Sequence, residues 1–128
     1  YDSYGSIIIL DFSTTWCGYC QVAASTAQEF QDRYSSNNLI YVTILIEDSY
    51  GNTPPDQSIL SSWSDTFGIS APIIAGSRDM IASSENEGWG VSGWPTFFVL
   101  DEDLVIYDIQ RGYSDINLAN IVDNLISQ

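Results

Sequence analysis

Apolar residues in the first half of the chain form two continuous runs that are separated by a stripe with helical spacing. The runs cover residues 6–13 and 39–46, a length and character typical of buried strands. The stripe between them predicts a helix over residues 17–34. Strand, helix and strand in this order favour a right-handed parallel crossover. The apolar positions of the stripe are Val22, Ala23, Ala27, Phe30 and Tyr34.

The middle of the chain predicts a second helix, a short edge strand and a loop. The helix spans about 56–67, with Gly68 as its stop, and the strand covers 72–75. Ser77 is a suitable N-cap for a short helix that continues to about residue 84. The glycine-rich segment 85–93 predicts an exposed loop.

The last third of the chain predicts a hairpin followed by a helix. Thr96 to Leu100 and Leu104 to Ile109 are strand-like runs on either side of an acidic turn, residues 101–103. Ser114 is placed to cap the last helix. The buried stripe of that helix is formed by Leu118, Ile121, Val122, Leu125 and Ile126.

The length and composition indicate one globular domain. The chain has 128 residues, of which 45% are hydrophobic and 13% aromatic, enough to build a core. It has no run of about 18 apolar residues, so we expect no stable membrane insertion of this segment, and we expect a monomer. Because the first residue is Tyr1, we also expect a processed or trimmed chain, in which any signal peptide or lipid anchor would not be visible.

The charge balance is strongly acidic. There are 17 Asp and Glu residues against three arginines, with no lysine, so the net charge is −14. This charge argues against nucleic acid or an anionic membrane as partner. Solubility is the simplest explanation, and a salty habitat or a basic partner remain alternatives. The chain has no histidine, which excludes Ser-His-Asp and Cys-His catalysis and histidine metal sites, and we expect no cofactor.

The only two cysteines, Cys17 and Cys20, lie between the first strand and the first helix. At the start of a helix, free backbone N–H groups and the helix dipole stabilise a thiolate, which is the nucleophile in thiol–disulfide exchange. Cys20, one turn further on, is placed to close a disulfide with Cys17. An inert disulfide or a pair of buried thiols is the alternative, but a bridge at this spacing constrains little unfolded-state entropy. The pair therefore predicts redox chemistry.

Three separated motifs resemble the thioredoxin family. They are Asp11-Phe12-Ser13-Thr14-Thr15-Trp16-Cys17-Gly18-Tyr19-Cys20, then Gly93-Trp94-Pro95-Thr96, and finally Gly112. The long segment at about 48–90 resembles the insertion of the redoxin or TlpA-like branch. The resemblance implies a single α/β domain with the thioredoxin fold: helices on both faces of a mixed five-stranded sheet. The implied strand order is 71–75, 39–46, 7–13, 96–100, 104–109.

The resemblance also implies roles for individual residues. Cys17 is expected to be the exposed nucleophile and Cys20 the buried resolving thiol. Pro95 is expected to be a cis-proline that faces the cysteines, and the backbone of Trp94 is expected to pair with a substrate strand. The expected substrate-binding residues are Trp16, Gly18, Tyr19, Trp94 and Pro95. The alternative for Trp94 is a packing role only, and Trp89 either completes an aromatic rim around the cysteines or packs on the core.

Asp11 occupies the position of a buried acid in thioredoxins. Burial in an apolar strand raises the pKa of a carboxyl group, and such a group can accept the proton of Cys20, directly or through a water. An exposed or hydrogen-bonded carboxylate at the strand end is the alternative. The family often pairs this acid with a lysine on the second strand. This chain has no lysine, and we expect the apolar Ile44 or Leu45 near Asp11.

The function predicted from these features is thiol–disulfide exchange with protein substrates, supported by a separate thiol reductant. No lysine or histidine is available to stabilise the Cys17 thiolate, so a reductase or isomerase is expected rather than a strong oxidant. A Cu(I)-binding, metallochaperone-like module and a thiol peroxidase are the alternatives. The resemblance, the missing methionine and the absence of lysine favour an extracytoplasmic bacterial location, periplasmic or secreted.

Overall fold

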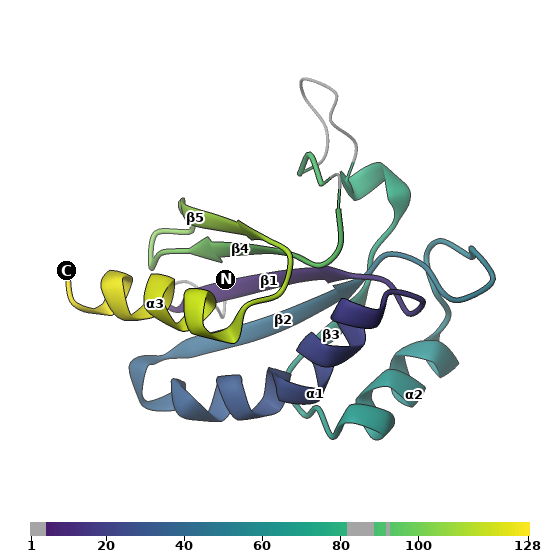
Figure 1. Ribbon diagram of the computed structural model, residues 1–128, viewed down its shortest axis with the longest axis horizontal. Helices are drawn as coiled ribbons and strands as arrows, with labels where there is room; N and C mark the ends of the chain where they lie inside the picture. The colour runs from purple at the N-terminus through teal and green to yellow at the C-terminus, as the bar shows by residue number, and fades with distance from the viewer. Residues whose placement is uncertain (1–4, 82–88, 92) are drawn as a thin grey trace.

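The computed structural model describes residues 5–81, 89–91 and 93–128 (Figure 1). In this part of the chain, strands and helices follow one another in the predicted order. They are β1 (Ile7–Ser13), α1 (Gly18–Arg33), η1 (Ser35–Asn37), β2 (Leu39–Leu45), α2 (Gln57–Phe67), β3 (Ile73–Ala75), η2 (Arg78–Ile81), β4 (Thr96–Leu100), β5 (Ile106–Arg111) and α3 (Asp115–Ile126).

The five strands form one mixed sheet in the order β3-β2-β1-β4-β5, which confirms the order that the resemblance implies. β1 and β2 are parallel, as are β2 and β3, whereas β4 is antiparallel to both β1 and β5. The central strand β1 places Asp11 opposite Thr43 on one side and Phe97 on the other. This register decides which side chains surround the buried acid.

Helical segments cover the two faces of the sheet unequally. The three α-helices contribute to one core, and in Figure 1 α1 and α2 lie side by side below the sheet. The opposite face is covered, within the described residues, by the short 3-10 helix η2 and residues 89–91. No described helix combines the length and the apolar character that a membrane crossing needs. The buried residues of the helix-covered core include Ile7, Ile9, Ala23, Ala24, Ala27, Phe30, Tyr41, Leu45, Trp63, Phe97, Val99, Leu118 and Val122.

Each α-helix begins at a residue whose side chain accepts a backbone N–H. Cys17 caps α1, Asp56 caps α2 and Ser114 caps α3. These caps satisfy N–H groups that have no partner within the helix. At the other end of α2, Gly68 takes a left-handed conformation with φ of 65°, as expected for a glycine stop.

Two details of the predicted helices are corrected. Val22 is not part of the buried stripe of α1, since 46% of its surface is exposed, and Ala24 is buried instead. Successive helical residues are rotated by about 100°, which places Val22 and Ala24 on opposite sides of Ala23. The short helix expected from Ser77 is a 3-10 turn over Arg78–Ile81, and residues 82–84 lie outside the described residues. Most of the loop expected at 85–93 also lies outside them.

The hairpin is also corrected, because its second strand begins at Ile106 and ends at Arg111, two residues later than predicted. Asp101 builds a longer turn: its Oδ1 accepts the backbone N–H groups of Asp103 and Val105 at 2.9 and 3.1 Å. Leu104 lies in this turn with φ of 64°, and its side chain is exposed. The predicted strand began too early because the apolar residues of this turn were assigned to the strand.

Candidate active site

The two cysteines lie at the junction of β1 and α1 as free thiols. Cys17 is the N-cap of α1, and its Sγ accepts the backbone N–H of Cys20 at 3.2 Å. Cys17 was expected to be exposed, but only 9% of its surface is exposed, against 0% for Cys20. The sulfur is turned toward the first turn of the helix because it caps it. Cys17 nevertheless remains the more accessible member of the pair.

Asp11 is buried in the sheet beneath α1, with 1% of its surface exposed. Its two carboxylate oxygens accept separate hydrogen bonds, from the Ser13 hydroxyl to Oδ1 at 2.5 Å and from the Tyr41 hydroxyl to Oδ2 at 2.6 Å. Burial raises the pKa of Asp11 to about 6, although both hydrogen bonds act in the opposite direction. The carboxyl group therefore titrates within the pH range of thiol chemistry.

The sequence analysis did not predict the two hydroxyl groups that bond to Asp11. Ser13 was within reach of sequence reasoning, because residues two apart on a strand share a face. Tyr41 was not, because its position depends on the register between β1 and β2. We expected Ile44 or Leu45 beside the acid, but the register of the two strands places Thr43 directly opposite Asp11.

Cys20 lies in a nearly closed environment. Burial raises the pKa of the Cys20 thiol well above its usual range, and hydrogen bonding with Cys17 and the charge of Asp11 add to this effect. Hydrogen bonds from the backbone of Thr14 and the hydroxyl of Ser13 act against it. The thiol therefore keeps its proton at neutral pH unless a neighbouring group accepts it.

The segment before β4 lies at the same end of the sheet as the cysteines, because β4 is antiparallel to β1 and begins where β1 ends. The Trp94–Pro95 peptide bond is cis. Trp94 is partly buried and Pro95 is buried. The backbone of Pro95 is fixed from one side, since its carbonyl accepts the N–H of Gly112 at 2.8 Å. The second and third motifs of the sequence therefore meet here.

Two aromatic side chains from the cysteine motif extend into solvent. Trp16 and Tyr19 have 49% and 69% of their surface exposed. Between them along the chain, Gly18 borders open space, with no atom near the position that a Cβ would take. Trp89 does not join this pair, since its ring packs against Phe12 and Phe98 at centroid distances of 5.8 and 4.9 Å. Trp89 therefore packs on the core of the opposite face.

Arg78 connects the aromatic residues on the two sides of the site, a link that the sequence did not predict. Its guanidinium forms an ion pair with Glu47, whose Oε2 accepts the indole N–H of Trp16 at 3.3 Å. The same guanidinium lies 5.8 Å from the ring centroid of Trp94. Three segments distant in the sequence are thus joined at the edge of the site.

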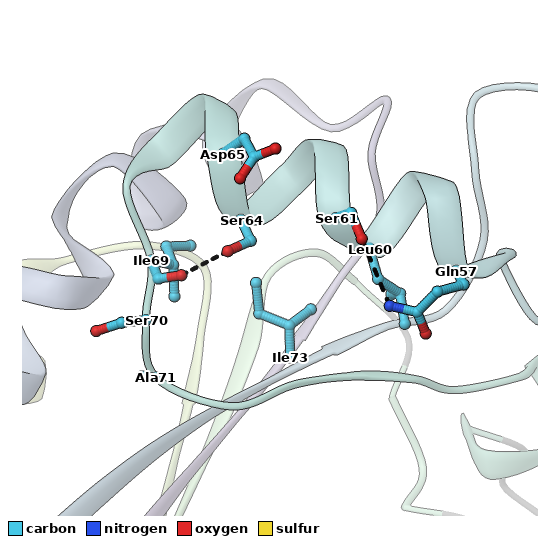
Figure 2. Close-up of a pocket in the computed structure, with 9 residues that line it drawn as sticks. All are labelled: Gln57, Leu60, Ser61, Ser64, Asp65, Ile69, Ser70, Ala71 and Ile73. Atoms are coloured by element: carbon cyan, nitrogen blue, oxygen red, sulfur yellow. Dashed lines mark hydrogen bonds between the residues drawn. The ribbon is translucent and has the colours of Figure 1, made fainter.

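Two cavities border α2 in the described part of the chain. The one shown in Figure 2 has a volume of about 300 Å³ and is lined by α2 and residues 69–73, none of which belongs to the cysteine site. The other, of about 350 Å³, lies between α2 and the cysteine motif, where Thr15 and Gln21 line it. No cluster of three or more metal-binding side chains occurs among the described residues.

Comparisons with known proteins agree with this geometry. No family model matches the chain. The thioredoxin-like protein YneN of Bacillus subtilis strain 168 is 25% identical over 111 residues, which cover 87% of this chain and 59% of YneN. The chain thus spans less than two thirds of the length of the curated relatives that it matches.

Solved structures show the same fold. A putative thiol:disulfide interchange protein DsbE from Chlorobium tepidum superposes with a TM-score of 0.78 at 18% identity, over 98% of this chain and 83% of that one. A secreted thiol-disulfide isomerase from Corynebacterium glutamicum superposes with a TM-score of 0.80 at 19% identity, over 99% of this chain and 74% of that one.

Proposed function

Starting from a thioredoxin fold with a cysteine pair at its first helix, and from its resemblance to redoxin or TlpA-like proteins, we propose that the chain is a thiol–disulfide oxidoreductase acting on protein substrates. One observation carries this proposal. The Cys17 sulfur caps α1 and accepts the N–H of Cys20, a position that stabilises a thiolate through hydrogen bonding and the helix dipole.

The proposed reaction has two exchange steps. The Cys17 thiolate attacks a substrate disulfide, forms a mixed disulfide and releases one substrate thiolate. Cys20 then loses its proton and attacks the Cys17 sulfur, so that the Cys17–Cys20 disulfide forms and the second substrate thiolate leaves. Two electrons pass from the cysteine pair to the substrate. Asp11, buried near Cys20, is the proposed acceptor of the Cys20 proton.

The surroundings of Cys17 support a reductase or an isomerase rather than a strong oxidant. A strong oxidant needs a reduced form that is greatly stabilised by its thiolate. Here one backbone N–H and the helix terminus stabilise the sulfur, and the chain has no lysine or histidine to add to them. The reduced pair is therefore a good electron donor.

The exposed aromatic rings support a protein substrate. Trp16 and Tyr19 provide contact area of the kind enriched at protein interfaces, and Gly18 between them borders open space. We propose that the backbone of Trp94, before the cis bond to Pro95, pairs with an extended substrate segment. A separate thiol reductant would return the oxidised pair to the dithiol.

The proposed location is extracytoplasmic in a bacterium. The secreted isomerase among the structural neighbours supports this proposal, as does the resemblance to the redoxin or TlpA-like branch.

Trapping of mixed disulfides tests the proposed function. The Cys20→Ser variant should hold substrates on Cys17, because the resolving thiol is missing, whereas Cys17→Ser and the double variant should hold none. The wild-type chain should reduce insulin with a thiol reductant, and neither single variant should. Cu(I) binding without insulin reduction, or peroxide consumption in its place, would favour the two alternatives and overturn the proposal.

A further inference from the structure

Two hydroxyl groups and one carboxylate form a continuous hydrogen-bonded group beneath α1. Ser13 Oγ lies 2.5 Å from Asp11 Oδ1, and Tyr41 Oη lies 2.6 Å from Asp11 Oδ2. All three residues are buried, with at most 2% of their surface exposed. A buried carboxylate is costly, so it is retained in the core where its hydrogen bonds are satisfied or its chemistry is used.

Ser13 is placed to interact with both ends of a proton path. It shares a face of β1 with Asp11, two residues away, and it lies one residue nearer to the cysteine motif than the rest of the strand. Its hydroxyl donates to Asp11 Oδ1, and hydrogen bonding by the same hydroxyl lowers the pKa of the Cys20 thiol. A hydroxyl group can donate one proton while it accepts another, which an ionised carboxylate cannot do.

We propose that Ser13 relays the proton from the Cys20 thiol to Asp11, and that Tyr41 positions the accepting carboxylate. This inference rests on the proposed function, because it concerns the step in which Cys20 attacks the mixed disulfide. In this proposal the proton of Cys20 reaches Asp11 through the Ser13 hydroxyl, rather than through an ordered water or by direct contact.

The relay conserves atoms and charge. The Ser13 hydroxyl passes its proton to Asp11 Oδ1 while Ser13 Oγ receives the proton of Cys20 Sγ. The thiol becomes a thiolate and the carboxylate becomes a carboxylic acid, so one negative charge moves from Asp11 to Cys20. When Cys20 then attacks the Cys17 sulfur, the substrate leaves as a thiolate, and Asp11 later returns its proton to solvent.

Tyr41 acts on this step only through Asp11. Its hydroxyl donates to Oδ2 and leaves Oδ1 for Ser13. Burial raises the pKa of Tyr41 well above its usual range, and the nearby charge of Asp11 adds to this, so the phenol remains a donor throughout the relevant pH range. The geometry therefore separates a positioning hydroxyl from a relaying one.

The groups that surround Asp11 come from β2, β4 and α1. β2 contributes Tyr41 and the uncharged Thr43, β4 contributes Phe97, and α1 contributes Cys20. Cys17 and Tyr113 interact with Cys20 and Tyr41 respectively.

No lysine or arginine side chain takes part in this group. The chain has no lysine, and two of its three arginines, Arg33 and Arg78, form ion pairs with acidic residues outside the group. Arg111, the third, lies exposed on β5.

Stopped-flow reaction of the reduced protein with Ellman's reagent tests the relay, because each thionitrobenzoate released reports one cysteine. The first release depends on reagent concentration and reports the attack by Cys17. The second is unimolecular and reports the attack by Cys20 on the mixed disulfide. In the wild-type chain we expect the second rate to rise with pH through an inflection near 6, where Asp11 becomes ionised.

Ser13→Ala should slow the second release at pH 7 by at least about 10-fold and remove its inflection, with the first release unchanged. Ser13→Thr keeps the hydroxyl and should restore both the rate and the profile. Tyr41→Phe should move the inflection to higher pH, because it removes a donor that stabilises the ionised carboxylate.

Thr43→Val is the matched control. Its hydroxyl is also buried beside Asp11 but has no hydrogen-bond partner, so its removal should leave both releases unchanged. An unchanged second rate and profile in Ser13→Ala would overturn the relay. A first release no faster than that of free cysteine would instead overturn the proposed function, so the two failures are distinguishable.

Discussion

The two faces of β1 are built from alternate residues of one strand and serve different purposes. On the face toward η2, Ile8 and Phe12 are buried in an apolar cluster where Phe12 contacts the rings of Trp89 and Phe98. On the face beneath α1, Ile7 and Ile9 are followed by the polar Asp11 and Ser13, which are equally buried. Solvent exposure does not distinguish the faces, but their chemistry does.

The difference teaches which buried residues stabilise the fold. Burial of an apolar ring removes its surface from water and lowers the free energy of the folded state. Burial of a carboxyl group raises that free energy unless the group is neutral or fully bonded. Substitutions on the η2 face should therefore reduce stability with little effect on chemistry, and substitutions of the polar residues on the α1 face should do the reverse.

Phe12→Ala should produce the largest effect. Phe12 is fully buried and its ring lies 5.5 Å from that of Phe98, so truncation leaves a cavity and should cost about 3–5 kcal/mol of unfolding free energy. Urea denaturation measures this loss. The pH profile of the second thionitrobenzoate release should keep its inflection near 6, because Asp11 is on the other face. A loss of that inflection in the folded variant would contradict the separation of the faces.

Asp11→Asn should raise the free energy of unfolding at neutral pH, whereas Phe12→Ala should lower it. The folded protein raises the pKa of Asp11 from 3.8 to about 6, so it holds this proton more tightly than the unfolded chain does. Stability therefore falls as pH rises from about 4 to about 6, by roughly 3 kcal/mol in total. The asparagine variant avoids this fall.

The expected result is a variant more stable than the wild type by up to about 3 kcal/mol at pH 7, with no advantage below about pH 4. Denaturation curves at a series of pH values measure it. Its second thionitrobenzoate release should be slow at every pH. A constant stability difference across the range would show that the hydrogen bonds to Ser13 and Tyr41, rather than ionisation, control the effect.

Much of this contrast could be predicted from the sequence, and part of it could not. The apolar run at β1 follows from periodicity, whereas the burial of Asp11 and the sheet order follow from the resemblance to the thioredoxin family. Tyr41 was not predictable as the partner of Asp11, because sequence patterns do not specify which residues of β1 and β2 lie side by side. The hairpin boundary was misplaced since the Asp101 carboxylate, rather than hydrophobicity, decides where the turn ends.

Thr43→Val sharpens the comparison within the α1 face. Its hydroxyl is buried and lacks a hydrogen-bond partner, whereas the hydroxyls of Ser13 and Tyr41 both bond Asp11. Replacement by the similarly shaped valine should stabilise the fold by about 1 kcal/mol, because it removes an unsatisfied polar group. Thermal unfolding measures this gain. Destabilisation by a similar amount would mean that the Thr43 hydroxyl contributes to the polar group around Asp11.

Arg78→Met should have the smallest effect, and it tests how the η2 face is joined to the site. Half of the Arg78 side chain is exposed, so solvent and salt screen its ion pair with Glu47, and its loss should cost about 0.5 kcal/mol. The cost should shrink further when the salt concentration is raised to about 1 M, and methionine keeps the apolar stem against Trp94. Glu47 retains the indole N–H of Trp16 as its partner, which limits the penalty of leaving the carboxylate half paired. A loss above about 2 kcal/mol that salt does not reduce would mean that Arg78 holds the two faces together rather than bordering the site.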